Sequence, residues 1–378
     1  MTAKNWAIRM GNNRKNTRST ISPLQIAIMY FTTAFGAGIL TLPRSVGTIA
    51  REDMWLSVIL GGLAIGFSLW CAVTLCRYFP NATAIEYHSS LLGPIVGQLV
   101  NMIYLMSIIL SGAAALRSFS GALKLFLFEA TPPWIILYVF LGVAAYAGQY
   151  GIAPLIRMQQ FILMAIAPTA IFLMSLGFLR VETKHFQPFL VGGLMPVLKG
   201  IVPSWFAYAG PELITGLAFP FITPKKKVIK AGLLTVAVLT VIYTIYTVIV
   251  QGILGVEETI VTVYPTIIAY REVNIPDTFI ERIDGYGLIL QIALYFLSLA
   301  NLLYFSAFGC SRLMKLEYSR PVIVFLVPVF YFIAMLPQSI EQINSFNRFV
   351  NNLVIFGGLF ILPLLLIIAK LRKAGRGS

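Results

Sequence analysis

The first long apolar run of the sequence, residues 21–46, is interrupted in its middle by the glycine-rich stretch 36–39. At about 1.5 Å per residue, a helix of this length crosses a bilayer. Each glycine costs about 1 kcal/mol relative to alanine in a helix interior, and Pro43 follows soon after. A helix broken in hydrocarbon leaves backbone groups unpaired, so such a break is tolerated where it lines a cavity or holds a ligand. The alternative is that the glycines only let another helix pack closely.

The composition indicates that the whole chain belongs in a membrane. Hydrophobic residues make up 58% of the 378 residues, and charged residues only 11%. Soluble domains carry about 25% charged residues, so we expect an all-α integral membrane protein surrounded by lipid. The net charge of +14 comes from basic residues in short loops and tails, where they set topology. We therefore expect no nucleic-acid partner.

Ten apolar runs are expected to be transmembrane helices. The tail 1–20 and the connection 255–284 are too polar to cross the membrane, and we expect the latter to be a long extracytoplasmic loop. The expected spans are 21–46, 55–78, 96–128, 134–150, 154–179, 194–221, 231–254, 288–308, 322–336 and 350–371.

The distribution of charge supports this count and gives an orientation. With the N-terminal tail in the cytoplasm, eighteen of the twenty-eight Lys and Arg residues fall on the cytoplasmic side. The connection 255–284 instead carries six acidic residues. This asymmetry predicts a multi-pass protein with both termini cytoplasmic.

The sixth expected span is interrupted like the first, at residues 205–212, where Gly210 and Pro211 disfavour a helix. Ten spans with breaks in the first and sixth predict two five-helix repeats, 21–179 and 194–371. Because five is odd, the second repeat must be inverted in the membrane. Broken helices at corresponding positions are typical of a transporter-type site at mid-membrane.

The two breaks offer opposite polarity to a ligand. The second half of span 1 is expected to begin near Ile39, so the N–H groups of residues 38–40 suit a carboxylate. The first half of span 6 is expected to end near Tyr208, and its free carbonyl groups suit an ammonium group. A zwitterionic amino acid matches this pair of breaks better than a sugar or a lipid.

Candidate functional side chains that are charged or polar lie inside or near the apolar spans. Glu212 follows the second break, and a buried carboxylate needs pairing, water or a proton. We interpret it as a ligand contact, a proton site or a gate; the alternative is a structural pair that caps the broken helix. Arg117 lies either on an aqueous path or in a structural ion pair. Ser107 faces the cavity or makes an ordinary interhelical hydrogen bond. The predicted ligand-binding residues are Gly36, Ala37, Gly38, Ile39, Ser107, Phe206, Tyr208, Gly210 and Glu212, with Arg117 and Glu212 as gating or pathway residues.

Five motifs in order along the chain carry a resemblance to a known family: residues 36–44, 210–212, 219–227, 264–265 and 279–284. They resemble the amino acid–polyamine–organocation transporter superfamily. The closer match is to the spore germination permease family, the B-type membrane subunit of nutrient germinant receptors. The first motif is typical of the superfamily as a whole, whereas its combination with the later motifs is more specific to the family.

The resemblance implies a subunit of the spore inner membrane that senses a small nutrient, typically an amino acid, and so triggers germination. It also implies partner subunits, an A-type membrane protein and a C-type lipoprotein. The alternative is a proton- or sodium-coupled amino acid transporter. Some proton-coupled relatives have a lysine at mid-depth in span 5, and this sequence has none there. Ser298 and Ser306 alone would make a weak sodium site.

No pattern in the sequence indicates an enzyme, a metal site or a cofactor. The two histidines, His88 and His185, are far apart in the sequence and are expected to lie in loops, and no nucleophile elbow or phosphate loop is present. The three cysteines lie in or beside apolar helices, which gives no disulfide framework.

Overall fold

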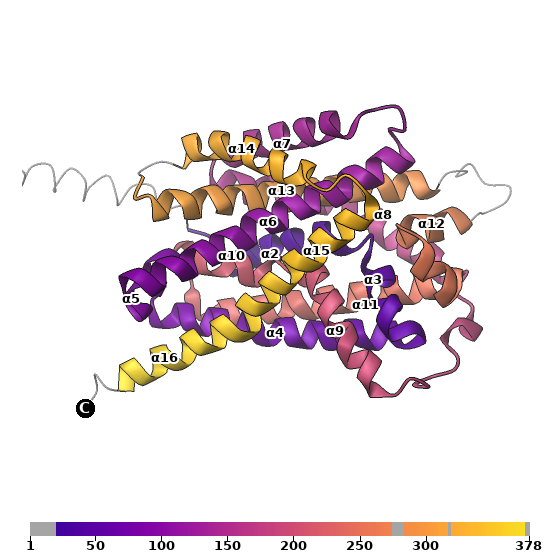
Figure 1. Ribbon diagram of the computed structural model, residues 1–378, viewed down its shortest axis with the longest axis horizontal. Helices are drawn as coiled ribbons and strands as arrows, with labels where there is room; N and C mark the ends of the chain where they lie inside the picture. The colour runs from indigo at the N-terminus through magenta and orange to yellow at the C-terminus, as the bar shows by residue number, and fades with distance from the viewer. Residues whose placement is uncertain (1–19, 274–282, 317–318, 375–378) are drawn as a thin grey trace, which may run out of the picture.

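The computed structural model describes residues 20–273, 283–316 and 319–374. Except for Thr20, the expected cytoplasmic tail 1–20 lies outside this part, as do residues 279–282 of the fifth motif. The regular secondary structure of the described residues is helical, apart from one parallel bridge between Ile21 and Ile222. The helices are α2 (Pro23–Gly38), α3 (Leu42–Ala50), α4 (Met54–Tyr78), α5 (Ala84–Leu92), α6 (Pro94–Phe126), α7 (Pro133–Gln149), α8 (Ile152–Phe178), α9 (Leu194–Tyr208), α10 (Pro211–Ala218), α11 (Val228–Val261), α12 (Pro265–Glu272), α13 (Ile283–Leu313), α14 (Arg320–Met335), α15 (Ile340–Ile355) and α16 (Leu362–Ala374) (Figure 1).

Local sequence signals set most helix ends. Ser22 caps α2 by accepting the Gln25 N–H at 3.2 Å, and Gln25 returns a hydrogen bond to the Ser22 N–H at 2.9 Å. Proline stands in the first turn of seven of the described helices, where its missing N–H has no intrahelical acceptor to lose. The predicted ends of spans 2 to 5 therefore agree with the structure within a few residues.

Six helical stretches in the described residues are long and apolar enough to cross a membrane, and two shorter apolar helices, α7 and α14, accompany them. The protein is therefore a multi-pass integral membrane protein with an all-helical fold. Long helices run nearly along one direction, and α15 and α16 form a continuous rod across them (Figure 1). The count of ten spans and the inverted 5+5 repeat remain predictions.

Two segments are more helical than the sequence indicated. The expected loop 255–284 begins as the last turns of α11, which bends at Gly255 with a φ of 73°, and it continues through α12. The acidic side chains of Glu257 and Glu258 are exposed, whereas Val256 and Thr259 are buried, so this part is an amphipathic helix. The last span also begins earlier than expected, at Ile340, because the Ser339 side chain caps it.

Helix α2 lies at the centre of the fold and is held by buried polar contacts. The amide Nδ2 of Asn301 on α13 donates to Thr33 Oγ1 at 2.8 Å and to Thr32 Oγ1 at 3.1 Å. Gln159 on α8 donates to Asn301 Oδ1 and accepts from Thr32 Oγ1 at 3.0 Å. Ser298 donates to the Thr33 carbonyl at 2.7 Å. This group, which we call the Asn301 network, joins α2, α8 and α13, and all five side chains are fully buried.

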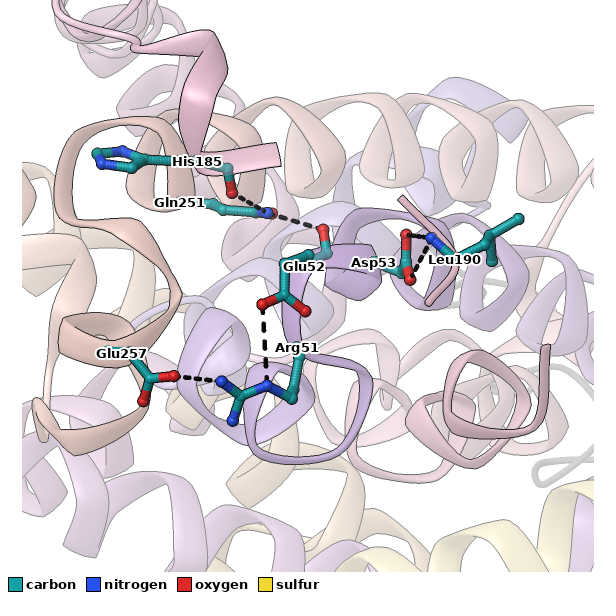
Figure 2. Close-up of polar contacts among 7 residues, drawn as sticks. All are labelled: Arg51, Glu52, Asp53, His185, Leu190, Gln251 and Glu257. Carbon is teal, nitrogen blue, oxygen red and sulfur yellow. Dashed lines mark hydrogen bonds and ion pairs between the residues drawn. The ribbon is translucent and has the colours of Figure 1, made fainter. Parts of the chain in front are cut away.

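A second polar cluster joins the α3–α4 junction to α11 and to the connection before α9 (Figure 2). Gln251 on α11 donates to the carbonyl groups of Glu52, at 2.7 Å, and His185, at 3.1 Å. The Asp53 carboxylate accepts the Leu190 N–H at 3.1 and 3.2 Å, and Arg51 pairs with Glu257. These contacts fix the position of the end of α3 relative to α11.

Candidate functional site

The first predicted break is present, between α2 and α3. Thr41 N donates to the Gly38 carbonyl at 3.2 Å, which closes a tight turn, and α3 begins at Leu42 with Pro43 in its first turn. The second half-helix therefore starts three residues later than predicted, because Ile39 keeps helical backbone angles (φ −60°, ψ −32°). The free N–H groups at the start of this half-helix belong to Leu42 and Arg44 rather than to residues 38–40.

The second break is present at the predicted place. α9 ends at Tyr208 and α10 begins at Pro211, and Gly210 between them has a φ of 152° and a ψ of −62°. This conformation is open to glycine and strained for other residues. The Ala207 carbonyl lies next to the carbonyl groups near Tyr208 that we expected to bind an ammonium group. It accepts a hydrogen bond from the Tyr243 hydroxyl at 2.8 Å. One of the carbonyl groups near this break is thus already hydrogen-bonded to a side chain of the protein.

The glycines at both breaks allow backbones to approach closely. A Cβ atom added to Gly38 would lie 2.4 Å from the Ala207 Cα atom, and one added to Gly36 would lie 2.5 Å from the Leu294 carbonyl oxygen. A Cβ atom on Gly210 would lie 2.9 Å from Thr33 Cγ2. The packing interpretation of the glycines therefore holds, and for Gly38 it holds together with the cavity interpretation, because Gly38 also borders a cavity.

That cavity, which we call the α3–α15 cavity, has a volume of about 410 Å³. It is enclosed by α3, α9 and α15 and reaches both breaks, at Gly38 on one side and at Phe206 and Ala207 on the other. Its size lies within the range of small-molecule sites. Of the predicted ligand residues, Gly38 and Phe206 border it.

One wall of the α3–α15 cavity is positive. Thr41, Leu42 and Arg44 place the start of α3 there, and the N-terminal end of a helix favours negative charge. Arg44 Nε donates to the Ile260 carbonyl at 3.2 Å, and Arg348, on the facing helix α15, brings a second guanidinium to the cavity. Within the described residues, neither arginine has a carboxylate at ion-pair distance. This wall suits a carboxylate.

The α15 wall of the same cavity offers acceptors. Asn351 donates its amide N–H to the Val202 carbonyl at 2.6 Å, and Asn347 donates to Ser118 Oγ at 2.9 Å. The Oδ1 atoms of both side chains are buried and accept no hydrogen bond. Because both oxygens have almost no accessible surface, the ammonium group of a zwitterion would reach them after the Asn347 and Asn351 side chains rotate towards the cavity.

Glu212 lies in a different and much smaller cavity, which we call the Glu212 cavity. Its volume is about 40 Å³, and it lies between α4, α5, α6, α10 and the π-helical turn η5 (Phe356–Ile361). Ser107 borders the same cavity. His88, assigned to a loop from the sequence, is instead a buried residue of α5 and also borders it.

The other predicted site residues make contacts between helices. Ile39 is buried, and its carbonyl accepts Thr266 Oγ1 at 3.1 Å. Tyr208 donates its hydroxyl to the Val58 carbonyl at 3.0 Å. Arg117 is buried and donates to the Pro337 carbonyl at 2.9 Å, which ties α6 to the connection between α14 and α15. The side chain of Ala37 lies outside the described part of the structure. The predicted single site is therefore divided, because its residues border two separate cavities.

Comparison with known proteins identifies the family. A family model described as "Spore germination protein", the spore permeases, matches residues 20–343. The chain belongs to the spore germination permease family. It is 30% identical to spore germination protein YndE of Bacillus subtilis over 364 residues, which covers 94% of this chain and 98% of YndE. It is 24% identical to spore germination protein A2 of the same organism, over 94% of this chain and 96% of A2. It is 26% identical to spore germination protein KB, over 79% of this chain and 80% of KB. It is thus a germination permease rather than an enzyme.

Solved structures show the same fold at low sequence identity. MhsT in complex with L-phenylalanine superposes with a TM-score of 0.67 at 14% identity, over 92% of this chain and 98% of MhsT. A Na⁺-coupled sialic acid symporter superposes with a TM-score of 0.61 at 11% identity, over 91% and 80%. This spore germination permease therefore has a transporter fold.

Proposed function

We propose that this permease is the nutrient-sensing subunit of a spore germinant receptor and binds an amino acid in the α3–α15 cavity. The supporting observation is that this cavity reaches both helix breaks and is bordered by the start of α3, by the guanidinium groups of Arg44 and Arg348, and by two asparagine side chains of α15. A bound zwitterion would bridge α3 and α15. Because the zwitterion contacts both helices, it would stabilise the arrangement of α3 and α15 to which it binds most tightly. The shift between arrangements can be no larger than the difference in binding free energy between them. The bound L-phenylalanine of MhsT, a protein of the same fold, is consistent with this occupant.

The proposal predicts that Arg44→Gln and Asn351→Leu each weaken amino acid binding at least tenfold, because each removes a hydrogen bond to a charged group, worth about 1.5–3 kcal/mol. The measurement is the thermal unfolding of the full-length chain in lipid nanodiscs, with each proteinogenic amino acid added separately. A binding amino acid raises the unfolding temperature as its concentration rises, and the dose dependence gives Kd.

The controls use exposed neighbours with the same side chains. Asn352→Leu changes the next residue of α15, which is exposed, and Arg157→Gln changes an exposed arginine of α8. Both should keep the Kd of the unmodified chain. An unchanged Kd in Arg44→Gln and Asn351→Leu would show that the amino acid binds elsewhere.

The alternative, a proton- or sodium-coupled amino acid transporter, differs in what the chain does alone. In the Asn301 network, amide N–H groups already satisfy the side-chain oxygens of Thr32 and Thr33, so no cation is required to hold α2 against α13 there. This favours sensing. Liposomes that contain the purified chain distinguish the two functions, since concentrative uptake of the bound amino acid would support the transporter.

The proposed receptor includes the A-type membrane subunit and the C-type lipoprotein implied by the family, in the spore inner membrane with both termini cytoplasmic. The similarity to proteins A2 and KB supports membership in such a complex. Affinity purification of the tagged chain from spore membranes tests the partners, and cysteine labelling of the tail 1–20 from each side of the membrane tests the orientation.

A further inference from the structure

The carboxylate of Glu212 is buried without a compensating charge. The residue is 3% exposed; Oε1 accepts the Trp205 Nε1–H at 3.3 Å, and Oε2 has no hydrogen-bond partner. Among the described residues, no lysine or arginine forms an ion pair with it. The start of α10 supplies a partial positive charge, but not a full one. A buried carboxylate in this position needs a positive partner.

The Glu212 cavity is too small for a nutrient but large enough for an ion. A single water needs about 10–15 Å³ of such volume, so 40 Å³ holds one or a few water-sized occupants. The α3–α15 cavity, at about 410 Å³, is ten times larger. The two cavities therefore take different classes of occupant.

Three polar groups that border or adjoin the Glu212 cavity have their hydrogens committed to other acceptors. The Tyr104 hydroxyl donates to the Leu213 carbonyl, and the Ser107 hydroxyl donates to the Ile103 carbonyl at 2.8 Å. The Asn101 amide N–H donates to the Ile85 carbonyl, so its Oδ1 atom accepts a hydrogen bond from the His88 Nδ1–H at 2.8 Å. His88 Nε2 thus keeps its lone pair. Because the hydrogens of Tyr104, Ser107 and His88 are already donated to other acceptors, these side chains offer only lone pairs to an occupant of the cavity.

We infer that the Glu212 cavity is a binding site for one monovalent positive charge, carried by an alkali cation or by a proton, distinct from the nutrient site. A single carboxylate balances a single charge. The described residues contain no group of three or more His, Cys, Asp or Glu side chains that would hold a divalent or transition metal. Other titratable side chains near Glu212 are Tyr30 of α2, Cys76 of α4, Tyr87 and His88 of α5 and Tyr104 of α6, and none of them is a lysine or an arginine.

The occupant of this site acts across the second break. Trp205 belongs to α9 and Glu212 to α10, so the hydrogen bond between them joins the two halves of the broken helix. The Trp205 ring also packs against η5, where a Cβ atom on Gly358 would lie 2.9 Å from Trp205 Cζ2. π-Helical turns are frequent at functional sites. A charge bound at Glu212 therefore biases the geometry of α9, which forms one wall of the nutrient cavity.

The test is thermal unfolding of the full-length chain in nanodiscs without any amino acid. At fixed pH and ionic strength, choline chloride is replaced by sodium or potassium chloride; in a second series in choline chloride, the pH is varied around neutrality. We expect the unfolding temperature to rise with an alkali cation or with added protons. Glu212→Gln should abolish that dependence, because the amide is neutral and brings N–H donors. The alkali series and the pH series distinguish the two carriers.

Two further variants keep the test decisive if Glu212→Gln does not fold. Ser107→Ala removes one lone-pair donor without changing charge and should raise the half-saturating cation concentration several-fold, or shift the pH midpoint. Glu258→Gln changes an exposed carboxylate of α11 and should leave the dependence intact. An unfolding temperature that is independent of cation and pH, or a dependence that survives Glu212→Gln, would overturn the inference. Either result leaves the nutrient site untested by this assay, so the two proposals fail separately.

Discussion

A Gly38→Val variant is expected to insert into the membrane and to lose amino acid binding. A Cβ atom at residue 38 would lie 2.4 Å from the Ala207 Cα atom, far inside the contact distance of two carbon atoms. The clash is with backbone, so no side-chain rotation relieves it, and the two broken helices must separate. Overpacking of this kind costs about 1–3 kcal/mol, and it displaces Ala207 from the wall of the nutrient cavity. Binding measured in nanodiscs should weaken at least a hundredfold, about 2.7 kcal/mol.

The matched control places the same side chain on an open helix surface. Gly142 of α7 is exposed, and a Cβ atom there meets nothing within 4 Å. Gly142→Val should bind the amino acid as the unmodified chain does. Combining Gly38→Val with Ala207→Gly should not restore binding, because the Ala207 Cα atom remains in place. Normal binding by Gly38→Val would show that the approach of α2 and α9 is irrelevant to the site.

The breaks were predictable because their causes are local. Gly210 and Pro211 disfavour a helix whatever surrounds them, and the stretch 36–39 with Pro43 does so more weakly. The second half of the first broken helix begins at Leu42, three residues after the predicted start at Ile39. Gly38 and Ile39 tolerate helical backbone angles, whereas Pro43 favours a position in the first turn of a new helix. The composition of the apolar runs likewise predicted a membrane fold.

The cavities were not predictable because they depend on how the helices are rotated. Glu212 follows Gly210 by two residues, yet the second half of the broken helix turns it towards α5 and α6, away from the α3–α15 cavity. Asn347 and Asn351 were missed because the first precedes the expected tenth span and the second stands at its start. Their spacing of four residues places them on one face of a helix, and that signal becomes useful only once α15 is known to begin at Ile340.

An Asn301→Leu variant is expected to unfold much more easily than the unmodified chain. Leucine has nearly the same size but cannot hydrogen-bond, so the Gln159 amide loses its acceptor and Thr33 loses a donor. Buried polar groups without partners cost about 1–3 kcal/mol each, so we expect a loss of about 2–5 kcal/mol in the free energy of unfolding. Thermal and denaturant unfolding in nanodiscs measure it. Asn352→Leu, at an exposed position, should change little.

A double-mutant cycle with Thr33→Val separates the network from simple packing. If Asn301 acts through its hydrogen bond to Thr33, the two changes together cost less than the sum of the single ones, by about 1 kcal/mol. Additive effects, or a loss below about 0.5 kcal/mol for Asn301→Leu, would show that the network does not hold α2 in place. Because Thr33 also packs against Gly210, a measured coupling would mean that α13 holds the part of α2 that faces the second break.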